Sequence, residues 1–213
     1  MRIGILGTGD VGKALGAAFL ALGHDVKMGA RDASNEKAAG WANESGPRAS
    51  SGSFADAAEF GEMIVLASLG VANPAVIEGA GPARLRGKVL IDATNPLDFS
   101  TGAPKLAVGH TDSGGEQVQR LAPGALVVKA FNTVGNLLMF RPDLPGGPPD
   151  MFICGNDEGA KKQVESLLKN FGWDVIDLGG IEASRHLEPM CMVWVLHGMR
   201  SGTWMHAFKL LKK

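Results

Sequence analysis

The first chemical signal in the chain is a set of glycines at the spacing G-x-G-x-x-G. A short, mostly apolar run, Ile3–Leu6, precedes it, and apolar residues at helical spacing follow it. A strand, a glycine turn and a helix in this order hold phosphates against backbone N–H groups at the positive end of the helix. We therefore expect a dinucleotide pyrophosphate to bind Gly7, Thr8, Gly9, Asp10, Val11 and Gly12. The alternative is a glycine turn with no ligand.

A guanidinium follows the second predicted strand, where the ribose of a dinucleotide usually meets the protein. This strand spans Asp25–Gly29, and Arg31 comes just past its tip. An NAD site normally carries Asp or Glu there, whereas Arg accommodates the 2′-phosphate of NADP. Lys37, at the start of the next helix, could add a second charge. We expect NADP(H), and the alternative is that Arg31 pairs with Asp32 while either cofactor binds.

The elements that must position these residues alternate along the chain. Continuous apolar runs predict buried strands at Met63–Ala67, Lys88–Asp92 and Leu126–Lys129. Helical patterns and caps predict helices at Asn35–Glu44, from Ser53, from Asn73-Pro74 and over Ser113–Leu121, with an irregular segment over Asn95–Thr111. This alternation predicts an α/β fold with a Rossmann-type doubly wound, mainly parallel sheet, and we assign residues 1–135 to an NADP-binding domain.

A smaller C-terminal unit, residues 136–213, follows a proline and glycine cluster at Pro142–Pro149. Its pattern predicts an α/β-to-helical unit that packs on the first domain and completes the acceptor site. The elements expected in it are a strand at Met151–Cys154, a helix capped by Asn156, a strand at Trp173–Leu178, and helix from Ile181 to the end, interrupted at Pro189 and Gly198. Arg185 and Glu188, three residues apart, are expected to pair.

Composition and charge are those of a cytoplasmic enzyme. The formal net charge is −1, which argues against a nucleic-acid partner. The longest apolar stretch, Met190–Leu196, is too short to span a bilayer. Because a strand is predicted directly after Arg2, we expect no signal peptide. Cys154 and Cys191 are expected to be buried and reduced. The five histidines have no partners at metal-ligand spacing, so we assign no metal.

Methionine and aromatic residues crowd the region from Met190 to Phe208. The simpler interpretation is a core helix. Because the segment is apolar on more than one face, homodimerisation through it is the second interpretation.

Several motifs together resemble a known family. They are Gly7–Gly12, Gly29–Asp32, Asp92–Pro96, Val128–Thr133, Cys154–Asp157 and Leu178–Glu188. Over nearly its whole length the chain is similar to the coenzyme F-420-dependent NADP reductase family, and also to the cytosolic oxidoreductase domain of the six-transmembrane metalloreductases. The resemblance implies hydride transfer between NADP(H) and a small-molecule acceptor.

The resemblance places further residues beside the nicotinamide. Because ligands of open α/β sheets bind at the carboxyl ends of strands, the segments just past three predicted strands should border it. The segments contribute Ser68 and Leu69, Asn95 and Pro96, and Lys129, Ala130, Phe131 and Asn132. Asn132 would orient the nicotinamide or acceptor, Lys129 would stabilise the reduced acceptor, and Phe131 would exclude water. For Asn95 and Asn132, a turn or cap role is the alternative.

The acceptor stays open among flavin-type rings. The archaeal deazaflavin reductases carry a histidine at the position of Asn132, and the pattern here is closer to the metalloreductase domain. That difference favours FMN or FAD over coenzyme F-420. Two other functions remain: an NADP-dependent dehydrogenase or imine reductase acting on a small metabolite, and a non-catalytic NADP(H)-binding sensor.

Overall fold

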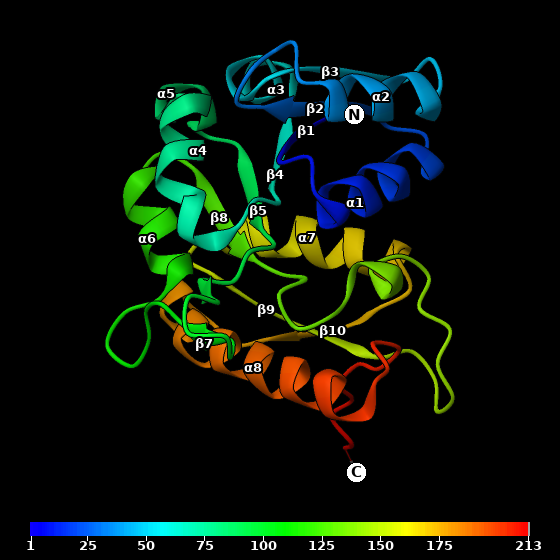
Figure 1. Ribbon diagram of the computed structural model, residues 1–213, viewed down its shortest axis with the longest axis vertical. Coiled ribbons are helices and arrows are strands. Elements are labelled where there is room, and N and C mark those ends of the chain that lie inside the picture. Colours follow the sequence, from blue (N-terminus) through cyan, green and yellow to red (C-terminus); the bar gives the residue numbers. More distant parts are fainter. Residues whose placement is uncertain (213) are drawn as a thin grey trace.

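The structure is a computed structural model that describes residues 1–212 (Figure 1). Eight strands form one sheet in the order β10-β9-β8-β5-β4-β1-β2-β3. β9 runs antiparallel to β8, and the other pairs of neighbouring strands are parallel. The strands are β1 (Arg2–Leu6), β2 (Asp25–Ala30), β3 (Ala49–Ser53), β4 (Met63–Leu66), β5 (Val89–Asp92), β8 (Leu126–Lys129), β9 (Asp150–Gly155) and β10 (Asp174–Asp177). The predicted α/β fold with a mainly parallel, doubly wound sheet is confirmed.

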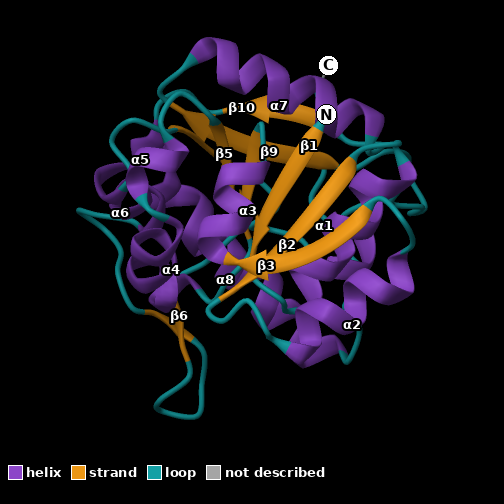
Figure 2. Ribbon diagram, turned by 90° about the horizontal axis from the view of Figure 1, so that it is seen from above, coloured by secondary structure: helices purple, strands orange, loops and turns teal. Residues whose placement is uncertain are grey.

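Helices cover both faces of this sheet, because successive strand residues point to opposite sides. Val65 belongs to the core under α1 (Asp10–Ala21), α2 (Glu36–Ser45) and α7 (Glu158–Asn170). Its neighbour Ile64 belongs to the core on the other face. That face is covered by α3 (Phe54–Phe60), α4 (Asn73–Ala80), α5 (Pro82–Leu85), α6 (Gly114–Leu121) and the first turns of α8 (Ser184–Ser201). Figure 2 shows α1 and α2 on one side of β1–β3 and α3–α6 on the other.

Residues after 135 extend the same sheet. They add β9 and β10 at its edge, α7 on one face, and α8 along the bottom of Figure 1. The division into residues 1–135 and 136–213 stays a prediction.

Several short elements escape the sequence pattern. β3 is an edge strand built from small and polar residues, and its pairing with β2 holds it in place. The segment expected to be irregular contains a two-stranded hairpin, β6 (Leu97–Asp98) and β7 (Lys105–Leu106). Short 3-10 turns also occur, at η1 (Gly70–Ala72), η2 (Asn136–Leu138) and η3 (Ile181–Ala183).

The expected interruptions of the last helix are wrong. α8 continues through Pro189 and Gly198 and ends at Gly202, whose φ of 71° is left-handed. Pro189 is inside the helix, in its second turn, where it removes one hydrogen bond without ending the helix. Gly198 makes room for a ring, since a Cβ there would lie 2.4 Å from Trp204 Cε3.

Two expected caps and one expected pair are also wrong. The cap of α4 is Ala72, and the Asn73 side chain instead bonds to Ser68 and Thr94. The cap of α7 is Asp157, whereas Asn156 Oδ1 accepts a hydrogen bond from the Ile181 N–H at 2.9 Å. Arg185 pairs with Glu116 and leaves Glu188 to bind elsewhere. The expected caps Ser53 and Ser113 are confirmed, and the Asn35 side chain caps α2.

Candidate functional site

The carboxyl ends of the parallel strands meet at one edge of the sheet and open into a cleft. The chain leaves β1 toward β2 on one side and leaves β4 toward β5 on the other, so the strand order reverses between β1 and β4. Open α/β sheets bind ligands at such a switch point. The cleft has a volume of about 600 Å³. The predicted site residues that line it are Gly7, Thr8, Gly9, Asp10, Val11, Arg31, Ser68, Leu69 and Asn95.

The glycine turn has the geometry that its spacing predicts. Gly7 has a φ of 138°, and a Cβ there would lie 2.3 Å from the Ala67 carbonyl oxygen. A Cβ on Gly12 would lie 2.4 Å from the Gly7 carbonyl oxygen, so the helix packs tightly on the turn. A Cβ on Gly9 would meet nothing within 4 Å, although Gly9 lines the cleft. The turn is therefore closed on the protein side and open on the ligand side.

The start of α1 also fits a bound anion. Its N-cap is Gly9, and no side chain caps the first turn. The first N–H groups of a helix lack partners within the helix, and they carry the positive end of its dipole. This cradle fits the pyrophosphate of a dinucleotide.

Arg31 lies at the tip of β2 and is free to bind a phosphate. It is exposed, and it lines both the main cleft and an adjoining pocket of about 280 Å³. Asp32 does not pair with it, and Asp32 Oδ1 instead accepts hydrogen bonds from the N–H and hydroxyl of Ser34 at 2.9 and 2.8 Å. Within residues 1–212, none of the ion pairs includes Arg31. Lys37 is exposed on α2 and does not line either space.

Asn95 lines the cleft, and Asn132 lies behind it. The Asn95 Nδ2 donates to the Asn132 carbonyl at 2.8 Å, and the Asn132 Nδ2 donates to Asn95 Oδ1 at 3.1 Å and to the Leu187 carbonyl at 2.9 Å. Asn132 is buried, and its Oδ1 has no partner within residues 1–212. Pro96 is buried beside this pair and does not line the cleft. Asn132 thus supports the side chain that faces the ligand space.

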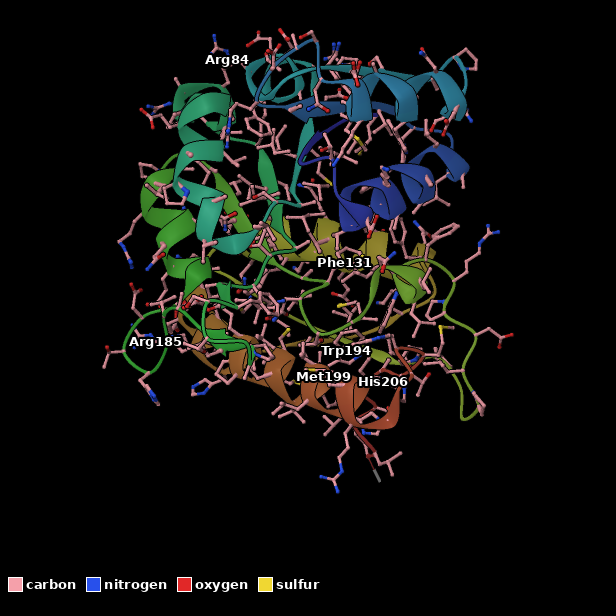
Figure 3. The ribbon with its side chains drawn as sticks, viewed as in Figure 1. Arg84, Phe131, Arg185, Trp194, Met199 and His206 are labelled. Carbon is pink, nitrogen blue, oxygen red and sulfur yellow. The ribbon has the colours of Figure 1, made fainter. Side chains whose placement is uncertain are left out.

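Ala130 and Phe131 are buried in the core, away from the cleft. The Phe131 ring lies 5.8 Å from that of Phe171, and Figure 3 shows it inside the molecule. Its φ of 62° is left-handed, which is strained for a bulky residue. This backbone turn sends the chain from β8 toward Asn132, so Phe131 contributes through conformation and packing.

Lys129 is fully buried and surrounded by acceptors. Its Nζ lies 2.7 Å from Asp92 Oδ2, 3.1 Å from Glu188 Oε1 and 2.9 Å from the Thr94 carbonyl oxygen. Burial lowers the pKa of Lys129, but the two carboxylates outweigh it and raise the pKa to about 12. Glu188 also accepts the N–H groups of Gly114 and Gly115, each at 2.9 Å, at the start of α6. Lys129 therefore ties β5, β8 and α8 together and does not line the cleft.

Sequence reasoning missed one side of the cleft. Asn136, Leu97 and Phe99 line it. Leu69 and Phe99 are 74% and 58% exposed, which is unusual for large apolar side chains beside a cleft. Phe99 could have been suspected only as an apolar residue in a segment without periodicity. Asn136 lies beyond the strand-end motif that was used to select site residues.

Two other kinds of site are absent from the part of the chain that is described. No group of three His, Cys, Asp or Glu side chains in residues 1–212 could hold a metal ion. None of the helices in this range combines the length and the apolar character needed to cross a membrane. Cys154 and Cys191 are buried and unpaired, as expected.

Comparisons with known proteins agree with this geometry. The family model described as "NADP oxidoreductase coenzyme F420-dependent" matches residues 2–96. The F420-dependent NADP reductase of Methanocaldococcus jannaschii is 33% identical over 201 residues, covering 89% of each chain. Metalloreductase STEAP3 of Rattus norvegicus is 27% identical over 204 residues, covering 89% of this chain and 36% of that protein, so this chain spans about a third of its length.

Solved structures also match over the whole chain. One of them comes from Arthrobacter sp. FB24 and is described as that of a candidate F420-dependent NADP-reductase. It is 41% identical, covers 100% of both chains and has a TM-score of 0.93.

Proposed function

This chain belongs to the F420-dependent NADP reductase family and is an NADP-dependent oxidoreductase, and we propose that it transfers a hydride between NADP(H) and a flavin-type acceptor. FMN, FAD and coenzyme F-420 are the acceptors proposed. The observation that carries the proposal is the shape of the cleft, which joins an uncapped helix start and a free arginine to an exposed apolar rim.

The polar end of the cleft suits the dinucleotide. The N–H groups at the start of α1 would hold the pyrophosphate, and Gly9 leaves room for its approach. Arg31 would hold the 2′-phosphate through paired hydrogen bonds, which a planar guanidinium makes well. This half of the site selects NADP(H) over NAD(H).

The apolar end suits a flat ring. Leu69, Leu97 and Phe99 line it, and two of them are strongly exposed. A ring stacked there would cover these side chains and exclude water from the reacting atoms. Asn95 and Asn136 supply the polar groups that would fix its orientation.

The chain's own contribution to the reaction is binding and orientation. When bound, the dinucleotide supplies the chemistry, a hydride passing between its nicotinamide C4 and the acceptor ring. Holding two rings in contact turns a bimolecular step into a unimolecular one. The Asn95–Asn132 pair and the buried Lys129 keep the strand ends rigid around that contact.

Two other functions predict different behaviour. A metabolite dehydrogenase or imine reductase normally needs a positioned acid or base. Among the described residues that line the cleft, Asp10 and Arg31 are the only ionisable ones, and both lie at its phosphate end. A sensor would bind NADPH but would not oxidise it, whichever acceptor is supplied.

Steady-state NADPH oxidation tests the three functions together. The acceptor panel consists of FMN, FAD, coenzyme F-420, a ferric chelate, and a ketone with an amine as imine precursors. We expect oxidation with at least one flavin-type acceptor and none with the imine precursors. Tight NADPH binding without oxidation by any acceptor would identify a sensor and contradict the proposal.

We also propose that a second copy of the chain covers the exposed side of α8. Val193, Leu196 and Met199 are each more than half exposed on this helix. The Trp194 ring stacks on that of His206, with centroids 4.9 Å apart, where the chain turns back from the helix end (Figure 3). Light scattering at micromolar concentration should give twice the mass of one chain, and Leu196→Glu should reduce it to one. A single-chain mass for the unmodified protein would contradict the dimer.

A further inference from the structure

A buried chain of hydrogen bonds connects the cleft to Lys129. The Ser68 hydroxyl donates to Asn73 Oδ1 at 2.8 Å, and the Asn73 Nδ2 donates to Thr94 Oγ1 at 2.8 Å. The Thr94 hydroxyl donates to Asp92 Oδ1 at 2.6 Å, and Lys129 binds the other oxygen of Asp92. Asn73, Thr94, Asp92 and Lys129 are all at least 97% buried. Ser68 lines the cleft, as does the small part of Thr94 that remains exposed.

The direction of every bond in this chain is fixed from its buried end. An ionised carboxylate only accepts hydrogen bonds, so the single hydroxyl proton of Thr94 must go to Asp92. Thr94 Oγ1 is then left as an acceptor, and Asn73 must turn its NH₂ group toward it. This orientation turns Asn73 Oδ1 toward Ser68, so the proton of Ser68 points inward.

Lys129 pairs with the carboxylate from which this direction starts. The ammonium lies 2.7 Å from Asp92 Oδ2, with no water between them to screen the pair. The Thr94 N–H also donates to Asp92 Oδ1 at 3.0 Å, so both oxygens of Asp92 act as acceptors. Lys129 therefore acts on the cleft through Asp92, although it does not line the cleft itself.

We propose that Asp92, Thr94 and Asn73 orient Ser68 so that it presents only acceptor lone pairs to the cleft, where it binds a donor group on the nicotinamide-riboside half of the dinucleotide. That donor is either a ribose hydroxyl or the carboxamide NH₂. This inference rests on the proposed binding of NADP(H). It gives Ser68 a binding role of defined polarity, and it makes Thr94 and Asn73 positioning residues.

Binding measurements with three ligands test the role of Ser68. NADP⁺ carries both donors, its 3-acetylpyridine analogue lacks the carboxamide N–H groups, and 2′,5′-ADP lacks the whole nicotinamide-riboside half. Ser68→Ala should raise the Kd for NADP⁺ roughly fivefold to tenfold and leave the Kd for 2′,5′-ADP unchanged. If Ser68→Ala raises the Kd for the 3-acetylpyridine analogue as much as that for NADP⁺, the donor is the ribose hydroxyl. If the Kd for the analogue does not change, the donor is the carboxamide.

Thr94→Val tests the positioning role. The valine has no hydroxyl, so Asn73 loses the acceptor that fixes its amide and Ser68 loses its set direction. We expect a loss of NADP⁺ binding similar to that of Ser68→Ala, and no further loss when the two changes are combined. Thr94→Ser retains the hydroxyl and should restore the binding of the unmodified protein. Unchanged 2′,5′-ADP binding reports that the variant is folded.

Three results are decisive. An unchanged Kd for NADP⁺ in Ser68→Ala would overturn the inference, as would additive effects of Ser68→Ala and Thr94→Val. Should Thr94→Val fail to fold, the Ser68→Ala and Thr94→Ser results still decide. Failure of the unmodified protein to bind 2′,5′-ADP would instead contradict the proposed dinucleotide site.

Discussion

The ammonium of Lys129 lies 2.7 Å from a carboxylate oxygen of Asp92, and both side chains are fully buried. Removing one partner of such a pair leaves the other charge buried alone, which typically costs about 3–5 kcal/mol. We expect Lys129→Met to lower the free energy of unfolding, measured in urea, by an amount of this order. The loss should be greater than that caused by most single substitutions.

Lys169→Met is the matched control for Lys129→Met. Lys169 pairs with Glu165 on the surface of α7, where the two side chains are 62% and 41% exposed. Exposed pairs of this kind contribute about 0.3–0.5 kcal/mol. If the two methionine variants lose similar stability, the buried pair does not hold the strand ends together.

The two glycines at the start of α1 should respond differently to alanine. Gly9→Ala places its methyl group in open space, so the thermal midpoint should not change. It should raise the Kd for NADP⁺ by about tenfold or more, because the methyl group blocks backbone hydrogen bonds to the charged pyrophosphate. Gly12→Ala would crowd the Gly7 carbonyl and should cost about 1–3 kcal/mol of stability. Calorimetric melting and NADP⁺ titration of both variants check this. Undiminished NADP⁺ binding by Gly9→Ala would place the pyrophosphate elsewhere.

Acid should weaken the contact between α6 and α8. Hydrogen bonds from Arg185 hold the pKa of Glu116 below its usual range, with the Ser113 hydroxyl adding to the effect against burial. Because the folded pKa is depressed, this stabilisation is present above about pH 4.5 and is lost as pH falls through the folded value. Unfolding in urea at several acid pH values should show a shallower loss of stability for Glu116→Gln than for the unmodified protein. Glu44→Gln, at an exposed position, should keep the original slope, and identical slopes for all three proteins would be inconsistent with the Arg185 contact.

Neither cysteine should react while the protein is folded. Burial raises the pKa of Cys154 to about 11 and that of Cys191 to about 12, so both remain thiols at pH 8. Because the thiolate is the nucleophile, a disulfide reagent should label the native protein very slowly and should label both residues after denaturation. Rapid labelling of one residue in the native protein would show that its surroundings open.

The nucleotide half of the site could be predicted from sequence because its chemistry is local. The glycines need only the strand before them and the helix after them, and Arg31 needs only the strand that ends beside it. The same holds for the serine caps of α3 and α6, which are set by residues three positions away.

Contacts between distant segments could not be predicted in this way. Lys129 lies at the end of a parallel strand, where site residues are expected. Its ammonium nevertheless pairs with two carboxylates from other elements and does not face the cleft. Asn73 has the sequence of a helix cap, but Ser68 and Thr94 compete for its side chain. Phe99 carries no periodic signal, and the β6–β7 hairpin brings it to the cleft. β3 lacks large apolar residues and depends on its pairing with β2.

The most direct measurement is the ratio of kcat/KM for NADPH to that for NADH with the best flavin-type acceptor, in the unmodified protein and in Arg31→Ala. Arg84→Ala, which removes an exposed arginine on α5, is the control. We expect the unmodified protein and Arg84→Ala to prefer NADPH clearly. In Arg31→Ala the ratio should fall roughly tenfold to a hundredfold, because kcat/KM for NADPH decreases while kcat/KM for NADH stays the same. Equal use of the two cofactors by the unmodified protein, or an equal loss for both in Arg31→Ala, would contradict an NADP(H) site built on Arg31.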